Sequence, residues 1–276
     1  MTRYRKKTFF QENSIYLLDN SVPLYSDGRV KLQILDKPPP DLPYRKLSST
    51  HYVNTETGEV FEYRKSGSRA ENLSTIRSSM NALRMIIEEN VVGGIEVHGV
   101  FTFSNPEYNF RNLYPVTKNF IARLRKKHPL IEYISVPEAH EDGSYHLHLI
   151  LKNGDGSRLF IPHAELSQIW GHGRVWVRRI VKKDYIASYL TSGAFNTDEG
   201  KGSRLLRYYP SHGRLFRYSR GIKKVRSIRM SYEQAQEFIG NRPLTFAKTI
   251  HVVRDNGDDT ETELTNVTYK HYSPME

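Results

Sequence analysis

The pattern of apolar residues between residues 95 and 200 predicts an α+β fold built around an antiparallel sheet. Four segments alternate apolar and polar residues as strands do: 98–104, 130–139, 145–153 and 173–181. Three others repeat apolar residues at helical spacing: 114–128, 161–171 and 182–194. The order β-α-β-β-α-β with a trailing helix is that of the ferredoxin-like, split βαβ plan. It predicts helices on one face of the sheet and leaves the other face free for a site.

The chain is expected to divide into four regions. In order they are an irregular N-terminal extension, a helix with a linker, the sheet domain, and a basic segment followed by a helix and a hairpin: 1–68, 69–94, 95–200 and 201–276. The apolar stripe of the helix at 70–90 must pack on a partner. Packing on the sheet gives one domain, whereas packing on a second copy of the chain gives an oligomer. The sequence leaves both open.

Turn and cap signals define the flanking elements. Thr57-Gly58 predicts a hairpin in the N-terminal extension, and Asn256-Gly257 predicts another near the end of the chain. Ser231 is expected to cap a helix over 231–240. Short regular elements are therefore expected outside the sheet domain as well.

The composition excludes several classes of protein. The 276 residues suffice for a sizeable core, and the absence of cysteine excludes a disulfide scaffold, a Cys-ligated zinc finger and a cysteine nucleophile. There is no apolar run long enough to cross a membrane and no signal-peptide apolar region at the N-terminus. We therefore expect a soluble, cytoplasmic protein without a membrane partner. A scan for GxxxxGK[ST] finds no P-loop.

The net charge of +11 is concentrated in one segment. Residues 201–229 contain ten lysines or arginines and no acidic residue. Aromatic residues interleave with these cations: Tyr208, Tyr209, Phe216 and Tyr218. Cations compensate phosphates and exposed rings stack on unpaired bases, so the segment predicts nucleic-acid binding. The alternative is a solvated basic face whose aromatic residues belong to the core. The candidate contacts are Arg204, Arg207, Arg214 and Arg217.

Two histidines one residue apart stand out in the predicted strand GSYHLHLIL. Side chains alternate between the faces of a strand, so His146 and His148 share one face, with their Cα atoms about 7 Å apart. Leu147 and Leu149 then point to the other face, where a core is expected. Two neutral imidazoles with one carboxylate suit Mg²⁺ or Mn²⁺ and leave positions open for a substrate. The pair predicts a metal site, and an accident of composition is the alternative.

Glu138, on the neighbouring predicted strand, is the candidate third ligand. Simple alternation puts Glu138 on the face of Ile134 and Val136, so we expect that only a twist at Pro137 turns it toward the histidines. Two substitutes for this ligand follow in the sequence: His140 and Glu141.

Two tyrosines follow the last predicted strand of the sheet. Tyr185 and Tyr189 are four residues apart, so they stack on one face of the predicted helix and can lean over the metal. An amphipathic helix with tyrosines in the core is the alternative. Cations at the junction of strand and helix are candidate phosphate contacts, or else ordinary surface charges: Arg178, Arg179, Lys182 and Lys183.

Three segments in this order resemble the HUH-type endonucleases that initiate rolling-circle replication. They are FTFSN for the first strand, PEAHEDGSYHLHLIL for the histidine strand and DYIASYLTS for the tyrosine helix, within residues 95–195. The tyrosines lie C-terminal to the histidine strand, as in replication initiators, whereas conjugative relaxases carry them N-terminal to it. Residues 95–200 are therefore interpreted as an HUH endonuclease domain.

The resemblance implies a nick in single-stranded DNA at the replication origin of a plasmid or virus. A tyrosine makes the nick, which leaves a 5′-phosphotyrosine and a free 3′-OH primer. His146 and His148 are implied as ligands of Mg²⁺ or Mn²⁺, with Glu138 as the candidate third. The YxxK-like frame favours Tyr185 as nucleophile, and Tyr189 is retained.

One departure from the family pattern concerns the lysine of the YxxK frame. Ser188 stands where many members have this lysine, and Lys182 and Lys183 are the nearby replacements. Without a P-loop, duplex unwinding falls to a separate helicase. The alternatives are an HUH transposase with the same chemistry, a non-catalytic RNA-recognition-like module and a phosphodiesterase that uses water.

Overall fold

The computed structural model describes residues 16–17, 21–37, 43–63, 73–195, 206–255 and 261–275. The chain forms two compact units. One comprises residues 65–224, and the other combines residues 1–64 with 225–276. The first unit is thus an insertion between the two sequence segments of the second.

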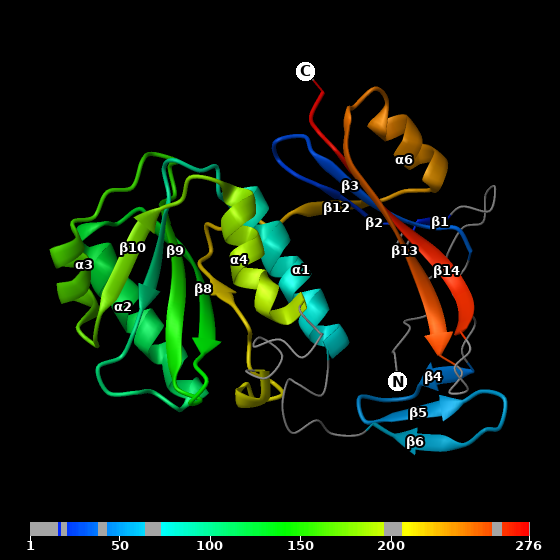
Figure 1. The fold of residues 1–276 in the computed structure, drawn as a ribbon, viewed down its shortest axis with the longest axis horizontal. Coiled ribbons are helices and arrows are strands. Elements are labelled where there is room, and N and C mark those ends of the chain that lie inside the picture. The colour runs from blue at the N-terminus through cyan, green and yellow to red at the C-terminus, as the bar shows by residue number, and fades with distance from the viewer. Residues whose placement is uncertain are drawn as a thin grey trace. The chain divides into compact units, whose positions relative to one another are not determined.

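The unit of residues 65–224 contains a five-stranded antiparallel sheet in the order β10-β7-β9-β8-β11 (Figure 1). Its strands are β7 (Val97–Phe101), β8 (Ile131–Ala139), β9 (Tyr145–Asn153), β10 (Val175–Arg179) and β11 (Arg217–Tyr218). Its α-helices are α1 (Leu73–Asn90), α2 (Leu113–Lys127), α3 (His163–Trp170) and α4 (Lys183–Phe195). The predicted α+β class is confirmed, and β7-α2-β8-β9-α3-β10-α4 follows the predicted order.

Helices α2 and α3 cover one face of this sheet (Figure 1). Leu147, Leu149 and Leu151 of β9 point to this face and are buried, as the alternation predicts. Phe120 of α2 and Trp170 of α3 complete the same core. Burial of these apolar faces holds α2 and α3 to the sheet and turns the alternate residues of β9 to the other side.

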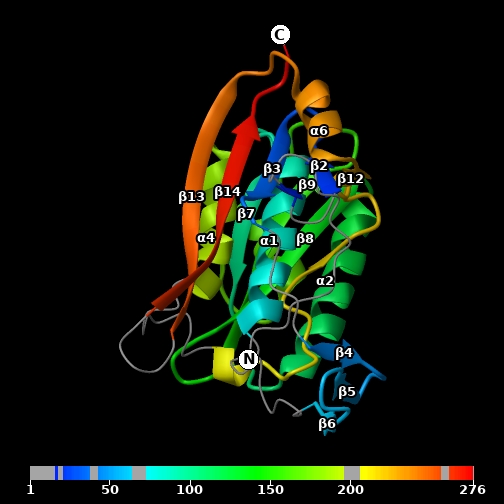
Figure 2. The ribbon, with the colours of Figure 1, turned by 90° about the vertical axis from the view of Figure 1, so that its right-hand side faces the viewer.

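The other face was expected to be free, and this expectation is wrong in part. Helices α1 and α4 lie on that side of the sheet (Figures 1 and 2). Ile76 and Leu83 of α1 and Ile186 of α4 belong to the same buried cluster as Ile134 and Ile150 of the sheet. The apolar stripe of α1 is therefore buried within the unit that holds the sheet, which leaves the end of this face around His146 and Glu138 for a site.

The second unit contains a six-stranded sheet in the order β12-β2-β3-β14-β13, with β1 paired to β3. The strands are β1 (Tyr16–Leu17), β2 (Ser21–Leu24), β3 (Val30–Leu35), β12 (Arg226–Arg229), β13 (Leu244–Asp255) and β14 (Glu261–Tyr272). Residues 21–35, expected to be irregular, form two strands because Val30, Leu32 and Ile34 alternate inward. Helix α6 (Tyr232–Ile239) packs on them, and Ser231 caps it in a capping box, as predicted.

A three-stranded sheet completes the described part of residues 1–64. It consists of β4 (Tyr44–Lys46), β5 (His51–Asn54) and β6 (Val60–Glu62). Strands β5 and β6 form the predicted hairpin, and Gly58 in its turn has a φ of +74°, which favours glycine. In the ranges that the structure describes, no helix is both long and apolar enough to cross a membrane.

Candidate metal centre and tyrosine pair

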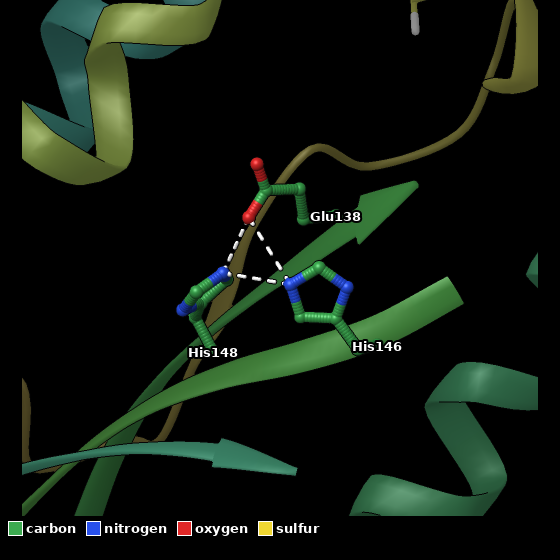
Figure 3. A group of neighbouring side chains, drawn as sticks. All are labelled: Glu138, His146 and His148. Atoms are coloured by element: carbon green, nitrogen blue, oxygen red, sulfur yellow. Dashed lines mark hydrogen bonds and ion pairs between the residues drawn. The ribbon is translucent and has the colours of Figure 1, made fainter. Parts of the chain in front are cut away.

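Three side chains converge at the end of the sheet face that α1 and α4 leave uncovered (Figure 3). Glu138 of β8 lies directly opposite His146 of β9, and His148 follows two residues later on the same face. The Nε2 atom of His146 lies 3.2 Å from Oε2 of Glu138 and 3.0 Å from Nε2 of His148. Nε2 of His148 contacts the same carboxylate oxygen. One ligand atom from each residue thus lies within 4.8 Å of the other two.

Glu138 reaches the histidines without the twist at Pro137 that we had expected to be needed. Val136 lies opposite His148, so the alternation that places Glu138 with Val136 also places it with the histidines. Of the two substitute ligands, His140 lies beside His146, with ring centroids 4.3 Å apart, and is exposed. The convergent group contains neither His140 nor Glu141.

The donor set fits a divalent cation. Two imidazole nitrogens and a carboxylate oxygen face one another, and this combination binds Mg²⁺ or Mn²⁺ as well as softer ions. Burial raises the pKa of Glu138, but hydrogen bonds and charge from His146 and His148 outweigh it and hold the pKa well below its usual range. The carboxylate is therefore ionised at neutral pH. Its side chain is 46% exposed, so the group opens to solvent on this side.

A third histidine, His98 of β7, lies behind the group and was missed in the sequence. Its Nε2 atom is 3.0 Å from Nδ1 of His148, and the two rings are nearly parallel. Burial, and then the positive charges of His148 and Arg178, lower the pKa of His98 to about 3, so its ring is neutral at pH 7. The only signal was its place on the strand beside the histidine strand, and the register needed to use that signal comes from the structure.

The two tyrosines of α4 lie at different distances from the histidines. The ring of Tyr189 packs edge-on against His148 and His98, with centroids 5.7 and 5.9 Å apart. Tyr185 stacks on Tyr189 at 6.4 Å, one turn earlier, and is 60% exposed. Burial, and then the charge of Glu138, raise the pKa of Tyr189 against an opposing effect of Arg178. The structure therefore brings Tyr189 next to the candidate metal group.

The cations near this helix have different surroundings. The guanidinium of Arg178 lies over the rings of Trp176 and Tyr185, at 5.0 and 5.6 Å. Arg179 points to the opposite face, where it donates hydrogen bonds to the carbonyls of Gly94 and Leu159. Arg179 is thus occupied by the backbone and lies away from the tyrosines.

The remaining basic candidates lie at three places. Lys182 is exposed just before α4, and Lys183 begins that helix. Arg207, Arg214 and Arg217 line hollows on the α2 side of the sheet, away from the tyrosines. Arg204 lies outside the described residues. Arg84 of α1 donates a hydrogen bond of 3.0 Å to Oγ of Ser188, so a guanidinium from another helix contacts the serine of the YxxS frame.

The aromatic residues of the basic segment belong mainly to the core. Tyr209 is 7% exposed, and its hydroxyl donates to the Pro137 carbonyl and accepts from the Ala139 amide. Three others are partly buried against the same core: Tyr208, Phe216 and Tyr218. This agrees with the alternative in which the aromatic residues of the basic segment are structural. The hydroxyl of Tyr209 also fixes the backbone on both sides of Glu138.

The order of these elements is also that of a known protein family. Residues 101–194 match the model of a family described as replication-associated protein ORF2. The match runs from the last residue of β7 to the end of α4, so it includes Glu138, His146, His148 and both tyrosines but not His98. It supports a replication-associated protein at the level of the family. Comparisons with curated proteins and with solved structures give no match.

Proposed function

We propose that the protein nicks single-stranded DNA with a tyrosine and transfers the strand, as an HUH-type initiator of rolling-circle replication. The observation that carries this proposal is the contact between the ring of Tyr189 and His148, one of three convergent ligands. A hydroxyl nucleophile on a helix thus lies beside a candidate divalent-metal site. The match to the replication-associated family supports the same conclusion.

Tyr189 is the nucleophile that the geometry favours, with Tyr185 as the second candidate. The phenol oxygen attacks phosphorus, the bond from phosphorus to the 3′-oxygen breaks, and that oxygen leaves with a proton as a 3′-OH. The strand stays linked to the protein as a 5′-phosphotyrosine. Because the ester conserves the bond, a 3′-OH can reverse the step and rejoin DNA, which is strand transfer.

Glu138, His146 and His148 would hold the metal ion. A bound Mg²⁺ or Mn²⁺ would withdraw charge from the scissile phosphate and stabilise the charge that develops in the transition state. The raised pKa of Tyr189 means that its hydroxyl is protonated in the free protein, so its proton must leave as the oxygen attacks.

The neighbouring cations position the DNA. Arg178 offers a guanidinium beside Tyr185, and Lys182 lies exposed at the start of the same helix. A strand in this place can stack a base on Trp176, which is 51% exposed. Arg84, through Ser188, orients the helix face between the two tyrosines. The proposed partners are therefore single-stranded origin DNA and a separate helicase for duplex unwinding.

A covalent-adduct assay tests the proposal. The protein is incubated with labelled single-stranded oligonucleotides and Mn²⁺ and then run on a denaturing gel. We expect a labelled adduct that survives SDS, that EDTA prevents and that Tyr189→Phe abolishes. We expect Tyr185→Phe to reduce adduct formation by less than about tenfold, since that ring lies one turn further from the histidines.

Other outcomes identify the alternatives. Cleavage without an adduct indicates a phosphodiesterase that uses water. Binding without cleavage, over many sequences that include replication origins, indicates a non-catalytic module. Adducts that form only on transposon ends, and not on replication origins, indicate a transposase with the same chemistry.

A further inference from the structure

A cavity of about 390 Å³ lies on the face of the sheet opposite to the metal group. Ser135 of β8 and Leu147 of β9 line it from the sheet. The residues that alternate with them along the strands, Val136 and His148, point to the other face. The cavity is therefore separated from the metal group by the sheet itself.

The charge of this cavity is one-sided. Arg111, Arg214 and Arg217 line it, and no aspartate or glutamate does. In the part of the chain that the structure describes, none of the three guanidinium groups forms an ion pair with a carboxylate. Guanidinium groups are flat donors that match phosphate oxygens in pairs. Three of them in one concave site indicate an anionic ligand.

The floor of the cavity carries a polar group that lacks a partner. Ser135 is 4% exposed, and its hydroxyl makes no hydrogen bond with any described residue. A buried hydroxyl without a partner is costly unless water or a ligand supplies one. Ser135 lies directly opposite Arg217 in the pairing of β8 with β11, so a ligand on this arginine also comes within reach of the hydroxyl.

The wall of the cavity is aromatic. Tyr114 of α2 lines it, and the guanidinium of Arg217 lies over the Tyr114 ring, 4.1 Å from its centroid. Phe110 lines it as well. Flat aromatic and guanidinium surfaces stack on nucleic-acid bases. The volume falls within the range of about 300–1,000 Å³ that small-molecule sites occupy. A base against this wall with its phosphate on the arginines satisfies both properties of the cavity.

A second hollow extends the site beyond one nucleotide. It has a volume of about 330 Å³ and shares Phe110, Arg111 and Pro210 with the first. Arg207 lines it, with its guanidinium 4.8 Å from the centroid of the Tyr208 ring, and no acidic residue does. Two adjoining basic and aromatic hollows fit successive units of a strand better than a free nucleotide.

We propose that this cavity binds one nucleotide of a single DNA strand at a point away from the scissile phosphate. The phosphate contacts Arg111, Arg214 and Arg217, and the base stacks against the wall of Phe110 and Tyr114. This inference rests on the proposed function in so far as the strand is the substrate DNA. It assigns the cavity to DNA anchoring and gives it no part in the chemistry.

Fluorescence anisotropy with a labelled single-stranded oligonucleotide tests the cavity. EDTA is present, so that no covalent step contributes. For Arg111→Gln/Arg214→Gln we expect binding about tenfold weaker than wild type, with the slope of log K against log salt reduced by about 1.4, the value for two phosphate contacts on a single strand. Arg158→Gln is the matched control, because Arg158 is exposed and lines neither hollow.

Two results would overturn the assignment. One is affinity and salt slope in the double variant equal to those of wild type and of Arg158→Gln, with unchanged thermal unfolding. The other is competition by free dTMP as tight as that of the oligonucleotide, which makes the occupant a free nucleotide. Adduct formation by wild type with Mn²⁺, run in parallel, separates the two proposals. An adduct with unaffected variant binding sinks the cavity alone, and weakened variant binding without any adduct sinks the nicking activity alone.

Discussion

Nε2 of His98 lies 3.0 Å from Nδ1 of His148, and both rings are almost completely buried. The other nitrogen of His148 faces Glu138 and His146. When His148 binds a cation through Nε2, its proton sits on Nδ1 and is donated to the neutral ring of His98. A ligand histidine whose second nitrogen is hydrogen-bonded in this way is held in one tautomer and one orientation.

Replacement of His98 is therefore expected to weaken metal binding. His98→Ala should lower the affinity for Mn²⁺ by about 10- to 100-fold, because His148 loses the partner that orients it. His98→Gln, whose amide oxygen accepts the same hydrogen bond, should retain most of the affinity. Isothermal titration calorimetry on the whole protein measures both, with the exposed His172→Gln as control. Equal affinity in wild type and His98→Ala would show that His148 needs no such partner.

Metal binding should stabilise the fold, and this stabilisation should depend on Glu138. A cation at about 100 times its Kd adds about 2.7 kcal/mol to the free energy of unfolding, since it binds only the folded chain. Thermal unfolding with and without Mn²⁺ should show a rise in Tm that EDTA reverses and that Glu138→Gln largely removes. Glu141→Gln is the matched control, as an exposed carboxylate outside the convergent group. Loss of the rise in Glu141→Gln instead would assign the third ligand to Glu141.

Removal of the Tyr209 hydroxyl should destabilise the edge of β8. Strand β11 pairs with Ile134 and Ser135, and beyond it the hydroxyl bonds Pro137 and Ala139 as a partner strand would. Tyr209→Phe leaves a buried amide and carbonyl unpaired, which should cost about 1–3 kcal/mol of unfolding free energy in urea. Affinity for Mn²⁺ should fall too, because Glu138 lies between the two bonded residues. Tyr208→Phe, at the surface, should stay within about 0.5 kcal/mol of wild type.

The adjacent arginines at the end of β10 should separate DNA binding from stability. Arg178→Gln should slow adduct formation by about tenfold while Tm stays unchanged, because its guanidinium lies beside Tyr185 and not in the core. Arg179→Gln should lower the free energy of unfolding by about 1 kcal/mol, because it loses hydrogen bonds to Gly94 and Leu159. Adduct rates and urea unfolding of both variants give the comparison. The reverse pattern would place Arg179, not Arg178, against the DNA.

Much of the site could be predicted because its patterns are local. Alternation alone places His146 and His148 on one face of β9, and helical spacing alone stacks Tyr185 on Tyr189. The face of Glu138 was harder, since it depends on which side of β8 the pair Ile134 and Val136 occupies. Both sides of the sheet bear helices, so apolar residues on β8 did not mark the face away from the site.

Contacts between distant parts of the chain could not be predicted. His98 meets His148 only through the pairing of β7 with β9, and Tyr209 meets β8 across about seventy residues of sequence. Strand β3 pairs with β14 through Leu35 and Val267, so the two ends of the chain form one sheet. No single segment carries a signal for such pairings, because each depends on the tertiary register.

The place of β7 has a practical consequence for anyone who wishes to excise the nuclease. The family match begins at Phe101, yet β7 ends there and is bonded to β9 on one side and β10 on the other. A fragment cut at that residue would keep both tyrosines and all three ligands but lose the strand that joins the tyrosine-bearing end to the ligand-bearing strands. Expression of residues 65–224 keeps that strand, together with α1 and the buried ring of Tyr209.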